Sequence, residues 1–297
     1  MVTTFEMLTT WNPVTASLLS PILVYWIASG FFAFLHWLNS PFFEKYRIHS
    51  PEEVTKRNRV PHLAVFRAVV FQQFCEIVVG VALAIFEGYP EPVNHQLQLL
   101  RYQSFFEKYF SSLVQALPFL PSLAYNCLVP LFQYMFAFFI IDTWQYFWHR
   151  YLHYNKKLYN MIHAHHHRLQ VPYAMGALYN HPFEGLILDT FGAGVAYLVA
   201  GLSPNQAIVF FTLSTLKTVD DHCGYLFPYD PLQIFFANNA RYHDLHHQPY
   251  GFQKNFSQPF FTFWDHVLGT YMAPKAESMI ERKIRGANNT LDVKKVN

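Results

Sequence analysis

Apolar residues form several long runs along the chain, with few charged residues inside them. Three of these runs exceed the roughly 20 residues that a helix needs to cross a bilayer; they cover residues 17–38, 63–86 and 123–148. Two shorter apolar runs, 186–202 and 207–219, are separated by the stretch GLSPNQ, whose Gly and Pro are typical of a turn. We therefore predict an all-α membrane protein with about three full transmembrane helices and a helical hairpin, spanning or re-entrant, which gives four or five membrane segments.

The loops between these runs differ in basic residues, and cytosolic loops are usually enriched in Lys and Arg. The stretches after the first and third runs are rich in both, whereas the stretch after the second run holds only Arg101 and Lys108. Residues 40–61 and 149–182 are therefore expected in the cytosol, together with the C-terminus. The chain ends in KKVN, which resembles the dilysine retrieval signal of endoplasmic reticulum membrane proteins. We predict a multi-pass protein of that membrane with a cytosolic C-terminus.

Composition supports the membrane interpretation and excludes other classes. Hydrophobic residues make up 52% of the chain and charged residues 13%, against about 25% charged residues in a typical soluble domain. The net charge of +2 and the scattered basic residues give no sign of a nucleic-acid interface. Cys75, Cys127 and Cys223 lie too far apart for a metal-binding pair, so we interpret them as small apolar residues.

Histidine is the residue in excess, and its spacing is regular. Eleven of the 16 histidines lie between His149 and His247. On a helix, residues three or four apart share a face, which predicts an HxxxH box and two HxxHH boxes whose rings point the same way. These boxes are His149 and His153; His163, His166 and His167; and His243, His246 and His247. His181 and His222 flank the predicted hairpin and would emerge at the same membrane surface.

So many clustered imidazoles would repel one another when protonated, and a shared cation removes that cost because neutral imidazole is a metal ligand. One zinc ion uses three or four protein ligands, so eight to ten histidines indicate two metals. Imidazole suits iron, zinc, copper or nickel, and the apolar surroundings favour redox chemistry on a lipid chain. Metal-bound histidines often donate to a carboxylate, and the candidates here are Asp142, Asp221 and Asp244.

The order HxxxH, HxxHH, HxxHH in a membrane chain resembles the fatty acid hydroxylase superfamily. Three longer stretches look like its fungal and plant sphinganine C4-hydroxylases: VPYAMGALYNHPFEGLILDT, TLKTVDDHCGY and NNARYHDLHHQPYGFQKNFSQPFFTFWDHVLGT. The close resemblance covers roughly residues 130–272. We therefore predict two parts of the chain. Residues 1–121 would form membrane helices and their connecting loops, and residues 122–297 would form the catalytic domain.

The resemblance implies metal ligation by the eight box histidines and by His222, with His181 as a ligand or a neighbour of one. It further implies two irons, O2 as co-substrate, and electrons from NADPH through cytochrome b5 and its reductase. No heme-binding HPGG occurs in the chain, so the electron donor would be a separate protein. The expected activity is hydroxylation of sphinganine or dihydroceramide at C4, which yields the phytosphingosine base. Glu76, Asp142 and Glu184 are equal candidates to meet the substrate ammonium.

Two alternatives remain open at this point. A sterol C5-desaturase or C4-methyl oxidase of the same superfamily would carry the same metal site. A membrane metal-binding protein without catalysis, such as a transporter or sensor, is the other. The concentration of histidines on one predicted side of the membrane argues against a transporter, which needs ionisable groups throughout the membrane depth.

Overall fold

The computed structural model describes residues 12–88 and 93–273, and its regular elements there are all helical. Four long helices form its frame: α2 (Pro13–Leu38), α5 (His62–Glu87), α8 (Val129–Tyr154) and α12 (Pro204–Asp221). The other α-helices are α3 (Pro41–Glu44), α4 (Pro51–Arg57), α6 (His95–Ala116), α7 (Leu120–Leu123), α9 (Lys156–Met161), α10 (Pro182–Gly185), α11 (Gly192–Val199), α13 (Pro231–Phe235), α14 (Ala240–His247) and α15 (Phe263–Val267). The remaining helical turns are η1 (Ala124–Leu128), η2 (His163–Arg168), η3 (Ala174–Leu178), η4 (Leu186–Phe191) and η5 (Pro249–Gly251).

Four helical stretches in the described residues are long and apolar enough to cross a membrane: Pro13–Leu38, His62–Phe86, Leu120–Tyr154 and Pro182–Val199. The first three match the predicted full spans, and the fourth is the first arm of the predicted hairpin. The second arm also forms, as α12, which packs along α2. The prediction of an all-helical multi-pass membrane protein is therefore confirmed.

Local sequence explains where these helices begin. Asn12 caps α2, because its side chain accepts hydrogen bonds from the Val14 and Thr15 amides. Ser203 and Gln206 form a reciprocal capping box at the start of α12, which satisfies two amides that have no partner inside the helix. Pro13 and Pro204 occupy the first helical position, where a missing N–H costs nothing.

The helix that carries the HxxxH box is unusually long. Residues Leu120–Tyr154 form one helical stretch of 35 residues, and at about 1.5 Å per residue it measures about 50 Å. The hydrocarbon core of a bilayer is only about 30 Å thick, so one end of this helix can extend beyond it. The predicted boundary between residues 121 and 122 falls within this stretch and stays a prediction.

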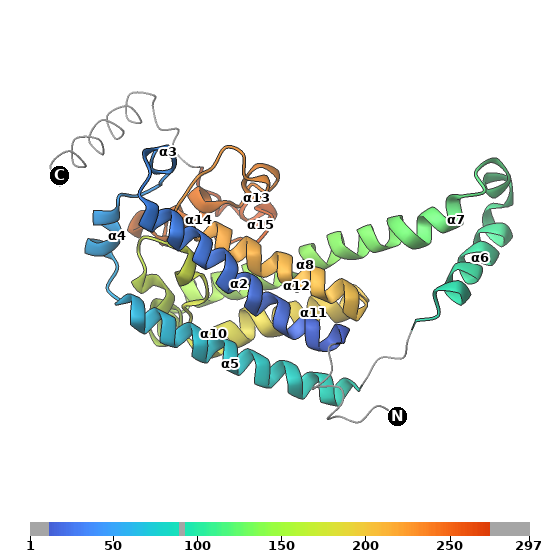
Figure 1. Ribbon diagram of the computed structural model, residues 1–297, viewed down its shortest axis with the longest axis horizontal. Helices are drawn as coiled ribbons and strands as arrows, with labels where there is room; N and C mark the ends of the chain where they lie inside the picture. Colours follow the sequence, from blue (N-terminus) through green and yellow to red (C-terminus); the bar gives the residue numbers. More distant parts are fainter. Residues whose placement is uncertain (1–11, 89–92, 274–297) are drawn as a thin grey trace.

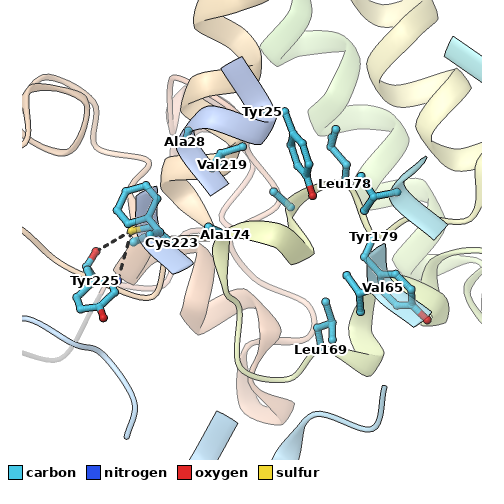
Figure 2. Close-up of a cluster of buried hydrophobic side chains, with 14 of the residues drawn as sticks. Tyr25, Ala28, Val65, Leu169, Ala174, Leu178, Tyr179, Val219, Cys223 and Tyr225 are labelled. Atoms are coloured by element: carbon cyan, nitrogen blue, oxygen red, sulfur yellow. Dashed lines mark hydrogen bonds between the residues drawn. The ribbon is translucent and has the colours of Figure 1, made fainter. Parts of the chain in front are cut away.

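A core of apolar side chains attaches the segment after η2 to the membrane helices (Figure 2). Tyr25 and Ala28 of α2, Val65 of α5 and Val219 of α12 pack against residues of the 169–179 segment. The Tyr25 hydroxyl also donates to the Met175 carbonyl at 2.5 Å. Because η2 directly precedes this segment, the core fixes the second histidine box relative to three helices.

A second core holds the first histidine box against the C-terminal region. Phe138 of α8 lies 4.2 Å from Phe260, measured between ring centroids, and also packs on Phe210 of α12. One turn along α8, Asp142 accepts hydrogen bonds from the amides of Phe260 and Phe261. These contacts fix the 255–262 loop beside the end of α8.

One long helix, α6, was not predicted from the sequence. The amphipathic helix α6 lies between the second and third spans and contacts α7 and η1. Figure 1 shows it standing away from the main body of the protein, where α2, α5, α8 and α12 lie together. Its mixture of charged and aromatic residues gave no long apolar run, and so the hydropathy pattern did not reveal it.

Candidate metal centre

Nine of the predicted histidines converge in two adjoining clusters at one end of the bundle. The five-histidine cluster consists of His149, His153, His163, His167 and His246. The four-histidine cluster consists of His166, His222, His243 and His247. Within each cluster, one nitrogen from every ring lies within 4.8 Å of all the others.

Each HxxHH box divides between the two clusters, which the spacing alone did not predict. His163 and His167 enter the five-histidine cluster, whereas His166 enters the other. In the box on α14, His243 and His247 belong to the four-histidine cluster, whereas His246 belongs to the five-histidine cluster. The members of each i,i+4 pair stay together, whereas the residue at i+3 crosses to the adjoining cluster. The expectation of one shared face therefore holds only for the i,i+4 pairs.

Backbone carbonyls determine which nitrogen of these rings faces the cluster. The Nδ1 atoms of His149, His246 and His247 donate to the carbonyls of Phe256, Lys254 and Leu169 at 2.9, 2.8 and 2.9 Å. His222 and His166 donate likewise to Thr218 at 2.8 Å and Tyr179 at 3.3 Å. A carbonyl can only accept, so Nδ1 carries the proton and the inward Nε2 of a neutral ring has a free lone pair.

A carboxylate has the same effect on His163. Glu184 is 3% exposed, and its Oε1 accepts from His163 Nδ1 at 2.5 Å. The Nε2 atom of His163 then lies 3.1 Å from that of His149, and both atoms hold lone pairs. The buried Nε2 of His246 has no hydrogen-bond partner. Lone pairs gathered in this way repel one another unless a cation lies between them.

The histidines are also in the protonation state that binds metal. Burial lowers the pKa of His222 to about 4 and that of His246 to about 3. Burial first, and neighbouring histidines second, lower the pKa values of His166, His167, His243 and His247. Neutral rings with aligned lone pairs and no thiolate in either cluster fit two first-row transition metals such as iron.

His181 lies in neither cluster. It caps α10 instead, where its Nδ1 accepts from the Phe183 amide at 3.3 Å. Its role as a ligand or as a neighbour of one stays a prediction.

The three predicted acidic partners of the histidines have other contacts. Asp142 accepts the two loop amides described above, and Asp221 forms an ion pair with Lys217. Asp244 accepts from His49 at 2.7 Å. From the sequence, Glu184 was a candidate only for contact with the substrate, and the carbonyl partners could not be predicted because no sequence pattern marks them.

Two adjoining spaces lie beside the clusters. A small polar pocket is lined by His149, His163, His166, His222 and His243, and also by Glu184 and Asn180. A much larger apolar cavity of about 750 Å³ lies between α2, α5, α11 and α12. Gln145, Asp189, Thr218 and Pro259 line both spaces. The histidine clusters therefore adjoin, through the polar pocket, a cavity in the size range of small-molecule sites, about 300–1,000 Å³.

The fold and the site together define an integral membrane protein with two histidine clusters that could hold metal ions, beside a large apolar cavity. The chain belongs to the fatty acid hydroxylase family, whose model matches residues 134–270.

Several relatives are similar to the chain over most of its length. The chain is 76% identical to sphingolipid C4-hydroxylase sur2 of Schizosaccharomyces pombe over the full length of both chains. It is 43% identical to sphinganine C4-monooxygenase 2 of Arabidopsis thaliana, over 92% of each chain. It is 42% identical to the very-long-chain aldehyde decarbonylase GL1-9 of Oryza sativa subsp. indica, over 87% of this chain and 88% of that one. No solved structure matches the chain.

Proposed function

We propose that the protein is a sphingolipid C4-hydroxylase, which converts sphinganine or dihydroceramide into the 4-hydroxylated product. Its full-length similarity to sur2 supports this assignment. The structural observation that carries it is the shared wall between the polar pocket at the histidines and the large apolar cavity. A long alkyl chain can occupy that cavity while a carbon near its polar end lies beside the metals.

The two clusters would each hold one iron through their inward-facing histidine nitrogens. The chemistry supplied by two bound irons is the activation of O2, which with two electrons and two protons puts one oxygen atom at C4 and releases the other as water.

The protein supplies the geometry for this reaction. The carbonyl partners keep the ligand tautomers fixed, and Glu184 orients His163. The apolar walls around Leu18, Ile77 and Phe211 hold the alkyl chain and exclude water.

The electrons would come from NADPH through cytochrome b5 and its reductase. The short helix α9 lies between the HxxxH box and η2, and its Lys156 and Lys157 are exposed. Positive charge close to the metal clusters suits an acidic electron carrier, because complementary charge steers association. This surface is on the side of the membrane that the basic loops assign to the cytosol.

The proposed location is the endoplasmic reticulum membrane, with the C-terminus in the cytosol. The histidine clusters would then lie on the cytosolic side, where the reductase system can reach them. The two lysines at 294–295, from which this location was predicted, lie outside the described residues.

Expression in cells that lack 4-hydroxylated bases, followed by lipid mass spectrometry, tests the proposal. We expect the wild-type chain to restore 4-hydroxysphinganine and a His166→Ala variant to fail at a similar protein level. Altered sterols with unchanged sphingoid bases would instead support a sterol oxidase. Consumption of long-chain aldehydes would support the activity named for the rice relative. Iron binding without any oxygenated lipid would favour a non-catalytic protein.

A further inference from the structure

Three carboxylates surround the place where the polar pocket meets the apolar cavity. Asp189 of η4 lines both spaces, Glu184 lines the polar pocket, and Glu76 of α5 lines the apolar cavity. Within the described part of the chain, no lysine or arginine lines either space. Asp189 is close enough to both glutamates to interact with their charges. Asp221 also lines the polar pocket, but it is paired with the buried Lys217. In the described part of the chain, the other three carboxylates form no ion pair with a lysine or arginine, so the junction between the two spaces is acidic.

Side-chain amides hold these carboxylates in place. Gln145 donates to Asp189 Oδ1 at 3.1 Å, and Asn180 donates more weakly to Oδ2 at 3.5 Å. Gln72 donates to Glu76 Oε1 at 2.8 Å. Gln72 has room to do so because it lies against Gly185, where a Cβ would stand 1.5 Å from its Nε2. Amide dipoles orient the carboxylates but bring no positive charge.

One of the carboxylate oxygens is left without any partner. Glu184 is 3% exposed, and its Oε2 forms no hydrogen bond although its Oε1 is used by His163. A buried acceptor without a partner is costly, and this one belongs to a residue that lines the polar pocket. A ligand that brings a donor with positive charge would remove that cost.

We propose that Asp189, with Glu76 and Glu184 beside it, receives the protonated amine of a free long-chain base. This inference rests on the proposed function and specifies its substrate: a base with a free amine rather than an N-acylated ceramide. With the amine at Asp189, the tail runs into the apolar cavity, and the carbons next to the amine face the histidines that line the polar pocket. Ceramides, sterols and aldehydes carry no such charge.

The test compares sphinganine with dihydroceramide as substrates of the full-length, metal-loaded protein. Asp189→Asn keeps the size and the hydrogen bond from Gln145 but removes the charge. We expect its KM for sphinganine to rise by roughly 30- to 4,000-fold, the range for breaking a buried charge pair, with kcat changed much less. Asp189→Glu should restore much of the affinity. Glu107→Gln, an exposed substitution on α6, is the matched control and should leave KM unchanged.

Inhibition by simple amphiphiles gives a second readout that needs no activity on ceramide. Octadecylamine should inhibit wild type more strongly than octadecanol, and Asp189→Asn should abolish that preference while it keeps its iron content. Equal inhibition of wild type by both compounds, an unchanged KM in Asp189→Asn, or a wild type that uses only dihydroceramide would overturn the inference and leave the proposed function intact. A wild type that hydroxylates neither lipid would overturn the proposed function itself.

Discussion

The Nε2 atoms of His149 and His163 lie 3.1 Å apart, although each ring already donates its Nδ1 proton to another group. The acceptors are the Phe256 carbonyl and the Glu184 carboxylate. Two neutral rings in this state cannot hydrogen-bond to each other, because both inward nitrogens are acceptors. The folded chain thus pre-arranges lone pairs around a point where a cation stabilises the structure.

Removal of one ligand should affect metal binding, whereas removal of its neighbour should not. His166→Ala takes one nitrogen from the four-histidine cluster, and we expect lower iron content and a loss of hydroxylation of at least about 100-fold. His165 lies in neither cluster and stacks on Tyr179, so His165→Ala is the matched control. Iron per protein and product formation are the measurements. Equal iron content and activity in the two variants would refute the ligand assignment.

Loss of the charge on Glu184 should weaken the metal centre without unfolding the protein. Glutamine can still accept the hydrogen bond from His163 Nδ1, but it lacks the negative charge that makes the His163 ring a more basic metal ligand. Substitution of such a partner typically lowers metal affinity by about 10- to 100-fold. We therefore expect Glu184→Gln to lose iron at chelator concentrations that leave wild type loaded. Identical chelator titrations for both proteins would contradict this role.

The metal-free protein should lose stability at acidic pH. His222 and His246 have folded-state pKa values of about 4 and about 3, below the usual 6.5. The unfolded chain therefore binds more protons than the folded chain below about pH 6.5. The contribution of these two neutral rings to the free energy of unfolding is fully present above about pH 6.5 and is lost as the pH falls through about 4. Thermal unfolding in detergent between about pH 7 and about pH 4 measures this, and bound iron should delay the loss. A flat profile over that range would show that these rings are not buried as neutral groups.

A larger side chain in the apolar cavity should change the alkyl-chain length that the protein prefers in its substrate. Gly194 lines the cavity, and a Cβ there would meet nothing within 4 Å. Gly194→Leu should therefore reduce kcat/KM for an 18-carbon base by about tenfold and favour shorter bases. Gly30 has the same open surroundings in α2 but does not line the cavity, and Gly30→Leu should behave as wild type. Competition between bases of different length measures the effect. A parallel loss in both variants would point to a general folding defect instead.

The sequence predicted those parts of the structure that depend on local periodicity. Long apolar runs gave the membrane helices, and pairs such as His243 and His247 stayed together because residues four apart share a helix face. The convergence of the three boxes followed from chemistry, since isolated buried imidazoles would be costly.

Long-range partners could not be predicted in the same way. Asp244 accepts from His49, which is 195 residues away in the sequence, although its position inside an HxxHH box indicated a partner of the metal-binding histidines. Asp142 faces the amides at 260 and 261 rather than a histidine. These contacts depend on which loops the tertiary fold brings together, and no local pattern encodes that choice.

The division of each box between the clusters has a consequence for biosynthesis. A nascent chain that has been made as far as His222, the residue that follows α12, already contains four of the five nitrogen donors of one cluster but only two of the four donors of the other. We expect iron to enter the two positions in sequence, with the second ion arriving only after α14 emerges from the ribosome. Chains stalled before residue 240 should therefore retain at most one ion after isolation, and two ions in such chains would exclude this order of assembly.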